Sequence, residues 1–174
     1  MPRIYLAGPG VFMPDARKRG ERLKAICAAY GCEGLYPLDA AISLPSKSRA
    51  KTRAIFDACL DMVRRADAVV ADLSPFRGPH CDDGTAVEIG IATERGIPVF
   101  GYSDDLRPLA SRIVHTIPRD GILRDASSIE VENYGHPFNS MIAGALYTEA
   151  FPTPAEAIAC AALYLSTGAT VPSP

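Results

Sequence analysis

The stretch DAVVADLSPFRGPHCDDGTAVEIGIATERGIPVFGY, residues 67–102, decides the fold class because it predicts a strand, a helix and a second strand. The apolar runs at 67–73 and 97–102 are short and rich in β-branched or aromatic residues, which favours strands. The segment 85–96 between them has a helical pattern and ends on Gly96, a typical helix stop. This order predicts a right-handed βαβ unit in a parallel sheet.

The same alternation extends over the rest of the chain. Further short apolar runs lie at 4–8 and 34–38, and helical patterns with an apolar stripe lie at 15–30 and 52–66. The predicted buried stripe of the second of these helices consists of Ile55, Cys59, Met62 and Val63. We therefore predict an α/β fold with one domain over residues 1–166 and a disordered tail over residues 167–174.

Composition narrows the classes of function and partner. The 174 residues suit one domain with a sizeable core, and a net charge of −2 with interspersed signs gives no footprint for nucleic acid. No apolar run has the length of a membrane span. The five cysteines are odd in number and lack CxxC spacing, and the three histidines lack metal-ligand spacing, which argues against disulfides and zinc. We expect a cytoplasmic protein without metal or cofactor.

Two loops at the carboxyl ends of predicted strands carry candidate ligand contacts, because parallel sheets bind ligands there. In the loop LAGPGVF at 6–12, Gly8 is either part of a tight turn or a point of close backbone approach to a ligand, with Phe12 as an aromatic wall. In the loop before the next helix, Asp82 and Asp83 either cap that helix or contact a ligand. We assign the cap more readily to Asp83, which leaves Asp82 as the ligand candidate.

A third region, residues 115–141, is long and rich in proline and glycine. Such a region in one compact domain is typical of a lid, a binding segment or an intersubunit arm. Asn139, near its end, either caps the apolar helix that follows or contacts a ligand.

Glu88 lies inside an apolar run of the predicted helix, next to Val87 and Ile89. It is either a surface position or a buried carboxylate that must be paired, hydrogen-bonded or shifted in pKa. The chain has no GxSxG or HExxH motif, so serine-triad and zinc chemistry are poor alternatives. Carboxylate chemistry is the alternative that remains.

Five pieces of the sequence, in order, resemble one enzyme family. They are IYLAGPGVF at 4–12, YPLD at 36–39, ADAVVADL at 66–73, PFRGPHCDDGTAVEIGIA at 75–92 and NSMI at 139–142. Over most of its length the chain is similar to the nucleoside 2-deoxyribosyltransferases. The resemblance implies a flavodoxin-like three-layer sandwich with a mainly parallel five-stranded sheet, and transfer of a 2-deoxyribosyl group between nucleobases.

The resemblance also assigns roles to individual residues. Glu88 is implied as the nucleophile that attacks C1′ of a 2′-deoxynucleoside, and Tyr5 as the hydrogen-bond donor that orients it. Asp82 is implied to anchor the 3′-hydroxyl, while Asn139 holds the 5′-hydroxyl across a subunit interface and Met141 packs beside it. The other predicted substrate-binding residues are Gly8, Phe12, Asp39, Cys59 and Gly84. The expected partners are 2′-deoxynucleosides, free nucleobases and further copies of the chain, in a homo-oligomer with shared sites.

Cys59 departs from the family pattern. It stands where the family carries an acid or amide that moves protons to and from the base, and a thiol is a weak donor. The candidate substitutes are Asp57, Asp61, Asp39 and ordered water. Two alternatives to the transferase therefore stay open: an N-glycosidase that passes the sugar to water, and a non-catalytic nucleotide-sensing module. Asn139 and the loop at 6–12 favour an unphosphorylated 5′-hydroxyl in the substrate.

Overall fold

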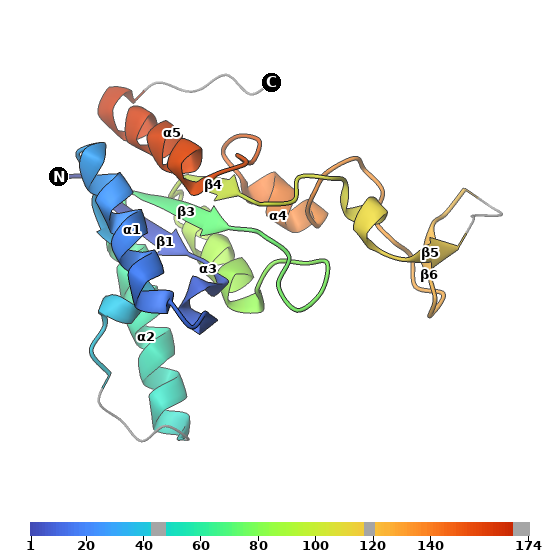
Figure 1. The fold of residues 1–174 in the computed structure, drawn as a ribbon, viewed down its shortest axis with the longest axis horizontal. Helices are drawn as coiled ribbons and strands as arrows, with labels where there is room; N and C mark the ends of the chain where they lie inside the picture. The colour runs from blue at the N-terminus through green and yellow to red at the C-terminus, as the bar shows by residue number, and fades with distance from the viewer. Residues whose placement is uncertain (43–47, 117–120, 169–174) are drawn as a thin grey trace.

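A four-stranded parallel sheet forms the centre of the fold (Figure 1). The computed structural model describes residues 1–42, 48–116 and 121–168. The strands are β1 (Arg3–Ala7), β2 (Glu33–Leu35), β3 (Ala68–Asp72) and β4 (Val99–Tyr102), in the order β2-β1-β3-β4. Neighbouring strands run parallel, and β1 lies inside the sheet with Tyr5 opposite Leu35 on one side and Val69 on the other. The two strands of the predicted βαβ unit, β3 and β4, are therefore neighbours in the sheet.

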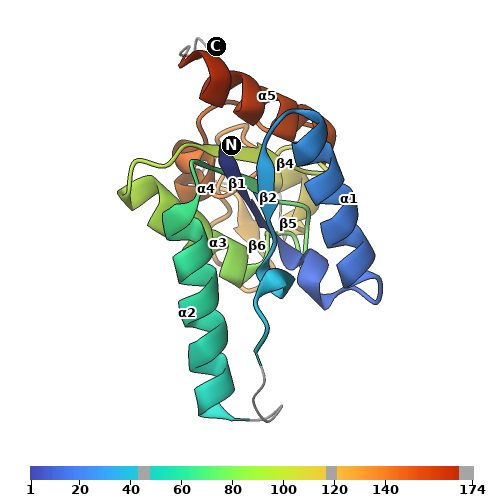
Figure 2. The ribbon, with the colours of Figure 1, turned by 90° about the vertical axis from the view of Figure 1, so that its left-hand side faces the viewer.

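Helices cover both faces of the sheet and make three layers (Figure 2). On one side lie α1 (Ala16–Ala29) and α5 (Pro154–Thr167), and on the other lie α2 (Arg49–Arg65), α3 (Asp83–Glu94) and α4 (Ser140–Ala145). Because side chains alternate along a strand, Ile4 and Leu6 belong to the core beneath α1 and α5, whereas Tyr5 and Ala7 belong to the core beneath α2 and α3. The predicted flavodoxin-like three-layer sandwich is confirmed.

The predicted count of five strands is wrong, because the central sheet has four. Beside β4 runs a segment that is only partly strand-like: the Tyr147 N–H donates to the Val99 carbonyl at 2.8 Å, and the Phe151 N–H donates to the Gly101 carbonyl at 2.9 Å. This segment makes an isolated bridge at Phe151 rather than a ladder. Pro152 comes next, and it has no N–H with which to continue the pairing.

Proline also shortens β2. The predicted strand at 34–38 ends at Leu35, since Pro37 starts a 3₁₀ helix, η2 (Pro37–Asp39). The Asp39 carboxylate accepts from the Tyr36 N–H at 2.9 Å, which closes this turn.

The first turns of α2 extend past the sheet (Figure 2). The stripe predicted to be buried on this helix is therefore buried in its second half only, where Met62 is 5% and Val63 0% exposed. Ile55, in the first half, is 46% exposed. The periodicity identified the helix correctly, but it carried no information on where the sheet beneath it ends.

A hairpin stands away from the body, beyond α4 (Figure 1). It pairs β5 (His115–Thr116) with β6 (Arg124–Asp125) in antiparallel fashion. The chain then returns through the buried Phe138 to α4. In the region predicted as a lid, binding segment or arm, the described residues thus form a projecting hairpin and a packed return, and residues 117–120 lie outside the described residues.

The C-terminal helix ends in an ordinary cap. Thr167 is the last residue of α5, and Gly168 follows it with φ 61°, donating its N–H to the Tyr164 carbonyl at 2.9 Å. Of the predicted tail, residues 169–174 lie outside the described residues.

Candidate active site

Tyr5 and Glu88 meet where β1 packs against α3. Tyr5 is fully buried and points from β1 towards the α2 and α3 layer, and its hydroxyl donates to Glu88 Oε1 at 2.6 Å. Glu88 is partly buried in the second turn of α3. The two residues that the resemblance implied as nucleophile and orienting donor are therefore brought into direct contact.

The surroundings of Glu88 raise its pKa to near neutral pH. Burial raises the pKa of Glu88 to about 7, the Tyr5 hydrogen bond opposes this rise, and the negative charge of Asp82 adds to it. The pKa of Tyr5 is raised too, chiefly by burial and then by the charge of Glu88, so the phenol keeps its proton and donates. A perturbed carboxyl beside a fixed donor is typical of a functional site.

Cys59 joins this pair from α2. Its thiol is free and lies close to both Tyr5 and Glu88. Burial raises the pKa of Cys59 above its ordinary value. The residue predicted to contact substrate therefore lies beside the carboxylate, which makes Tyr5, Glu88 and Cys59 one cluster.

Asp82 is the N-cap of α3, and the cap predicted for Asp83 is wrong. The Thr85 N–H donates to Asp82 Oδ2 at 3.0 Å, and the Thr85 hydroxyl lies 3.3 Å from the same oxygen. Asp83 is the first helical residue and is exposed. Gly84 keeps this corner open, since a Cβ there would lie 3.0 Å from Asp82 Oδ2. The cap uses one oxygen of Asp82 and holds the carboxylate at the end of α3 nearest Glu88.

The loop after β1 is a tight packing point with an exposed aromatic ring beside it. Gly8 has φ 149°, and a Cβ there would lie 2.6 Å from the Cβ of Asp72, so glycine is required by the approach of β3. Phe12 is 61% exposed and stacks on Phe76 with ring centroids 5.6 Å apart. The Arg77 guanidinium lies over both rings.

Sequence reasoning misses Phe76 and Arg77 as neighbours of Phe12. Phe12 lies in a different loop, so only the folded chain brings the three together. An aromatic residue after Pro75 in an otherwise polar loop is the sequence signal that points to Phe76 as a contact residue.

Asp39 is occupied by structural contacts. Its carboxylate accepts from Lys24 at 2.6 Å and from the Tyr36 N–H at 2.9 Å. Lys24 and Asp39 are both more than a third exposed, so water screens the ion pair and its contribution to stability is small. Asp39 therefore caps the turn at 36–39. Its predicted contact with substrate remains a prediction.

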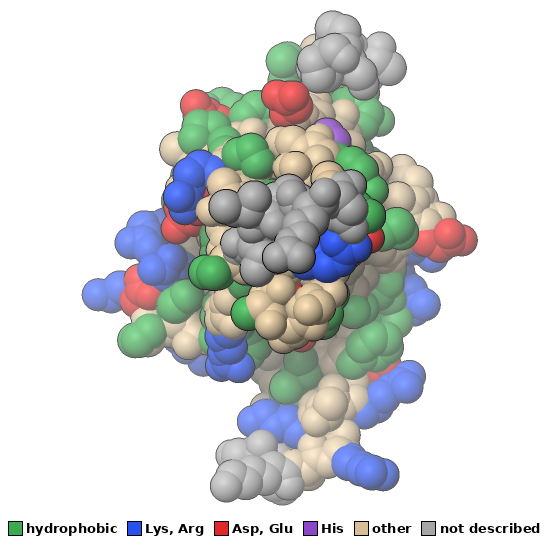
Figure 3. Space-filling model, turned by 90° about the vertical axis from the view of Figure 1, so that its right-hand side faces the viewer, with side chains coloured by type: hydrophobic (Ala, Val, Ile, Leu, Met, Phe, Trp, Pro, Cys, Tyr) green, Lys and Arg blue, Asp and Glu red, His purple; other side chains and the backbone are tan. Residues whose placement is uncertain are grey.

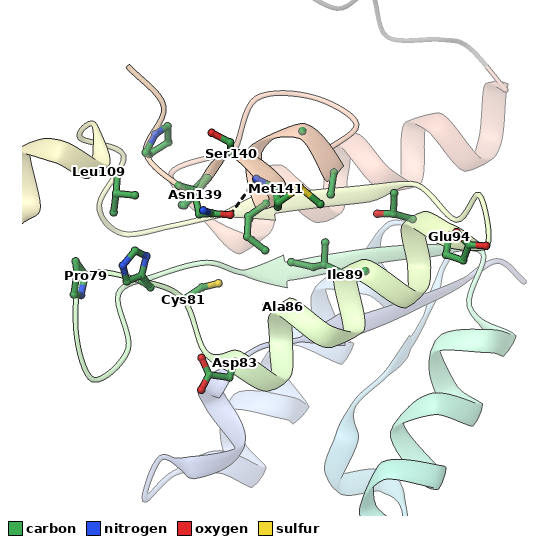
Figure 4. A pocket seen from close by; sticks show the side chains of 18 residues that line it. Pro79, Cys81, Asp83, Ala86, Ile89, Glu94, Leu109, Asn139, Ser140 and Met141 are labelled. Carbon is green, nitrogen blue, oxygen red and sulfur yellow. Dashed lines mark hydrogen bonds between the residues drawn. The ribbon is translucent and has the colours of Figure 1, made fainter. Parts of the chain in front are cut away.

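A cavity of about 770 Å³ lies between α3 and α4 (Figure 4). Asn139, Ser140 and Met141 form one wall, and Cys81, Asp83, Ala86 and Ile89 lie on the other. Asn139 caps α4 by accepting from the Met141 N–H at 3.0 Å, and its amide donates to both oxygens of Glu132 at 3.1 Å. Met141 is 81% exposed.

Glu88 does not line this cavity, because α3 separates the two places. Asp83, Ala86, Ile89 and Gly90 face the cavity and share one side of the helix. Glu88 is two residues from Ala86, which places it about 200° around the helix axis, towards Tyr5 and Cys59. The structure thus brings Tyr5, Glu88, Cys59 and Asp82 together, and it holds Asn139 and Met141 of the same chain on the far side of α3.

A family model described as nucleoside 2-deoxyribosyltransferase matches residues 4–141. The chain belongs to this family. The match contains Tyr5, Cys59, Asp82, Glu88 and Asn139. Membership in the nucleoside 2-deoxyribosyltransferase family indicates an enzyme that acts on nucleosides.

Solved structures of 2-deoxyribosyltransferases resemble this chain. A 2-desoxiribosyltransferase from Leishmania mexicana is 31% identical with a TM-score of 0.77, and the match covers 94% of this chain and 99% of that one. A 2-deoxyribosyltransferase from Bacillus psychrosaccharolyticus is 21% identical with a TM-score of 0.51, over 68% and 86% of the two chains, and supports the fold alone.

A curated protein is also similar to this chain in sequence. An uncharacterized protein of Schizosaccharomyces pombe, C191.05c, is 34% identical over 116 residues, which are 65% of this chain and 55% of that protein. The chain therefore matches little more than half the length of this relative.

The described surface is mixed in character. Basic, acidic and hydrophobic side chains are interspersed on the face that carries the hairpin (Figure 3). Within residues 1–42, 48–116 and 121–168, no three His, Cys, Asp or Glu side chains are grouped to hold a metal ion. In the same part of the chain, no helix has both the length and the apolar character to cross a bilayer.

Proposed function

We propose that this protein transfers a 2-deoxyribosyl group between nucleobases through a covalent bond to Glu88. The observation that carries the proposal is the 2.6 Å hydrogen bond from Tyr5 to Glu88 Oε1, in a partly buried site at one end of α3. The family match over residues 4–141 supports the substrate class.

The first step breaks the bond between the sugar and its base. An oxygen of ionised Glu88 attacks C1′, the bond from C1′ to the base nitrogen breaks, and the base leaves with that electron pair and takes up a proton. A carboxylate held against C1′ stabilises the positive charge that develops on the sugar. In the second step a nitrogen of another base attacks C1′, loses its proton to solvent and releases the Glu88 carboxylate, so the configuration at C1′ is retained.

The neighbours of Glu88 have separate tasks in this scheme. Tyr5 donates to Oε1, which leaves Oε2 as the attacking atom. The cap contacts of Asp82 both use Oδ2, so Oδ1 is the atom that accepts a hydrogen bond from the 3′-hydroxyl. Phe12 offers exposed ring surface for the base, which the apolar face of a nucleobase can cover.

The 5′-hydroxyl is assigned to Asn139 of a second copy of the chain. Within one chain α3 stands between Glu88 and the cavity that contains Asn139. Met141 is 81% exposed beside Asn139, and a partner subunit would cover it. The proposed enzyme is therefore a homo-oligomer with shared sites. Its five free cysteines suit the cytoplasm.

A mixing experiment tests the shared site. Glu88→Gln and Asn139→Ala chains, each inactive or weak alone, are denatured together and refolded, and base exchange is measured. Recovered exchange supports a site built from two chains, since a hybrid holds one intact Glu88 with one intact Asn139. Activity no higher than the sum of the two separate variants contradicts it.

Hydrolysis is the second candidate, and the position of Cys59 favours it. The thiol lies beside Glu88, and a thiol is a poor proton relay for a departing or entering base. If water takes the place of the second base, the products are free base and free deoxyribose. A non-catalytic nucleotide-sensing module is the third possibility, in which Glu88 would hold the sugar without bonding to it.

One assay separates these functions. The protein is incubated with 2′-deoxyinosine plus adenine, and with thymidine plus cytosine, with and without the acceptor base, and the products are separated by chromatography. Exchanged deoxynucleoside supports the transferase, while free sugar formed at a rate indifferent to acceptor supports the hydrolase.

A trapped deoxyribosyl adduct on the peptide that contains Glu88, read by mass spectrometry, separates both enzymes from the sensing module. Glu88→Gln should form no adduct. Glu21→Gln, an exposed glutamate of α1, is the matched control and should behave as the wild type.

A further inference from the structure

A second cavity, of about 450 Å³, lies on the opposite face of the sheet from Glu88. It is lined by Leu6 of β1 and Tyr102 of β4, which belong to the core beneath α1 and α5, whereas Tyr5 belongs to the other core. Loops after β1 and β3 form its mouth, where the strand order reverses. Ligands of α/β sheets bind at such a point, and the volume lies in the range of small-molecule sites.

The Tyr36 side chain supplies an unused donor to this cavity. Tyr36 is 3% exposed and lines the cavity, and among the described residues its hydroxyl has no hydrogen-bond partner. A buried hydroxyl without a partner is costly, and buried polar groups are nearly always paired. The hydroxyl lies beside Gly10, where an added Cβ would be 3.1 Å away.

The ring of Tyr36 is held in place by a glycine inside a helix. Gly20 is in the middle of α1, and a Cβ there would lie 2.5 Å from the Tyr36 ring. Glycine inside a helix costs about 1 kcal/mol relative to alanine. The fold therefore accepts a weaker helix in order to seat this ring, which fixes where the hydroxyl points.

Acceptors and further donors surround the hydroxyl. Burial, and then the charge of Asp72, raise the pKa of Tyr102, and both residues line the cavity together with Arg19. Asp104 and Arg22 complete the charged lining, so two carboxylates and two guanidinium groups balance. The rest of the wall is apolar, with Met13, Leu23, Ile26 and Phe76. A balanced charge favours a neutral ligand, and apolar walls with a few fixed polar groups favour a flat ring.

We propose that this cavity is a second binding site, for an uncharged heterocycle of nucleobase size that accepts a hydrogen bond from Tyr36 and donates one to Asp72. The choice of nucleobases as the ligand class rests on the proposed function, which supplies such molecules. Arg19 also lines the cavity, and its partly exposed side chain is free to move outward when the ligand enters. The site is separate from Glu88 and needs no chemistry.

Equilibrium dialysis with radiolabelled hypoxanthine and thymine tests the site. The proteins compared are the wild type, Tyr36→Phe, and Tyr30→Phe as a matched control, because Tyr30 is 51% exposed. We expect two classes of site in the wild type and in Tyr30→Phe, and a loss of about tenfold in the affinity of one class in Tyr36→Phe. The melting temperature of Tyr36→Phe should not fall, since the hydroxyl has no protein partner.

Gly10→Ala is the second variant, because its Cβ would fill the space next to the hydroxyl and should weaken the same class. Binding by Tyr36→Phe and Gly10→Ala that equals the wild type overturns the inference, and so does a Tyr36→Phe protein that melts earlier than the wild type. Base exchange is measured separately. If the protein does not exchange bases but binds them in a way that depends on Tyr36, only the proposed function is overturned. If it exchanges bases but its binding does not depend on Tyr36, only the second site is overturned.

Discussion

Glu88→Gln should make the protein clearly more stable at pH 8 and only slightly more stable at pH 5. The fold raises the pKa of Glu88 to about 7, chiefly by burial, from the value of 4.5 expected for the unfolded chain. Between these two pH values the folded chain binds a proton that the unfolded chain has lost. The stability of the wild type therefore falls as the pH rises through this window, and the loss is complete above pH 7.

The size of the effect follows from the shift. One pKa unit corresponds to about 1.4 kcal/mol, so the full shift limits the loss to about 3 kcal/mol. Glu88 is partly exposed and water screens its charge, so we expect about 1–2 kcal/mol, or roughly 2–8 °C in melting temperature for a chain of this size. Glutamine keeps an oxygen for the Tyr5 hydroxyl and carries no charge, so it removes the cost and retains the bond.

Thermal and urea unfolding at pH 5, 6, 7 and 8 measures this difference at one fixed protein concentration, because assembly would otherwise change the apparent stability. Glu21→Gln, exposed on α1, is the control for the loss of one carboxylate and should follow the wild type at every pH. If the free energies of unfolding of Glu88→Gln and wild type differ by the same amount at every pH from 5 to 8, the reasoning is refuted, since Glu88 would then titrate near its ordinary value.

Four further variants probe the residues assigned to the substrate site. The rate of base exchange by the wild type should rise as the pH increases through about 7, because Glu88 must ionise. Tyr5→Phe should move this rise to a pH about one to two units higher, because a hydrogen bond to a charged group contributes about 1.5–3 kcal/mol. A rise at the same pH in Tyr5→Phe and wild type would show that Tyr5 does not have its assigned role. Asp82→Asn should retain the cap of α3 and the melting temperature but lose most of kcat/KM, whereas Asp82→Ala should also cost about 1 kcal/mol of stability; equal activity of Asp82→Asn and wild type would leave Asp82 as a cap only. Asn139→Ala should raise KM for deoxynucleosides without preventing the Glu88 adduct, and an unchanged kcat/KM would show that Asn139 only caps α4 and binds Glu132.

The layers of the fold could be predicted because each depends on local pattern. The apolar runs around Val69 and Phe100 are short, β-branched or aromatic, and separated by a capped helix, so they specify a βαβ unit without knowledge of the rest. The number of strands depends on the edge of the sheet, where Pro152 stops the pairing of Phe151 with Tyr102. Pairing at an edge is a tertiary property, and an apolar run alone does not determine it.

The site divides in the same way. The motif around Glu88 led to Tyr5 through resemblance, and their contact at 2.6 Å follows from the central place of β1. The place of Cys59 in the site was indicated by the resemblance alone, since a cysteine on an amphipathic helix is more often a core residue. The stacking of Phe12 on Phe76 joins two loops and depends on the parallel order of β1 and β3.

The two faces of α3 explain why residues of this one helix contribute both to the cavity that contains Asn139 and to the cluster around Tyr5. Ala86 and Ile89 pack towards the cavity that holds Asn139, and Glu88 between them turns towards Tyr5. A helix with its side chains is about 10 Å across, so a sugar bonded to Glu88 cannot also reach the Asn139 of its own chain around that width. If both residues hold one substrate, a second chain must present its Asn139 and Met141 to this Glu88. The reciprocal contact then follows from two-fold symmetry, and each chain gives its cavity side to one site and its Glu88 side to another.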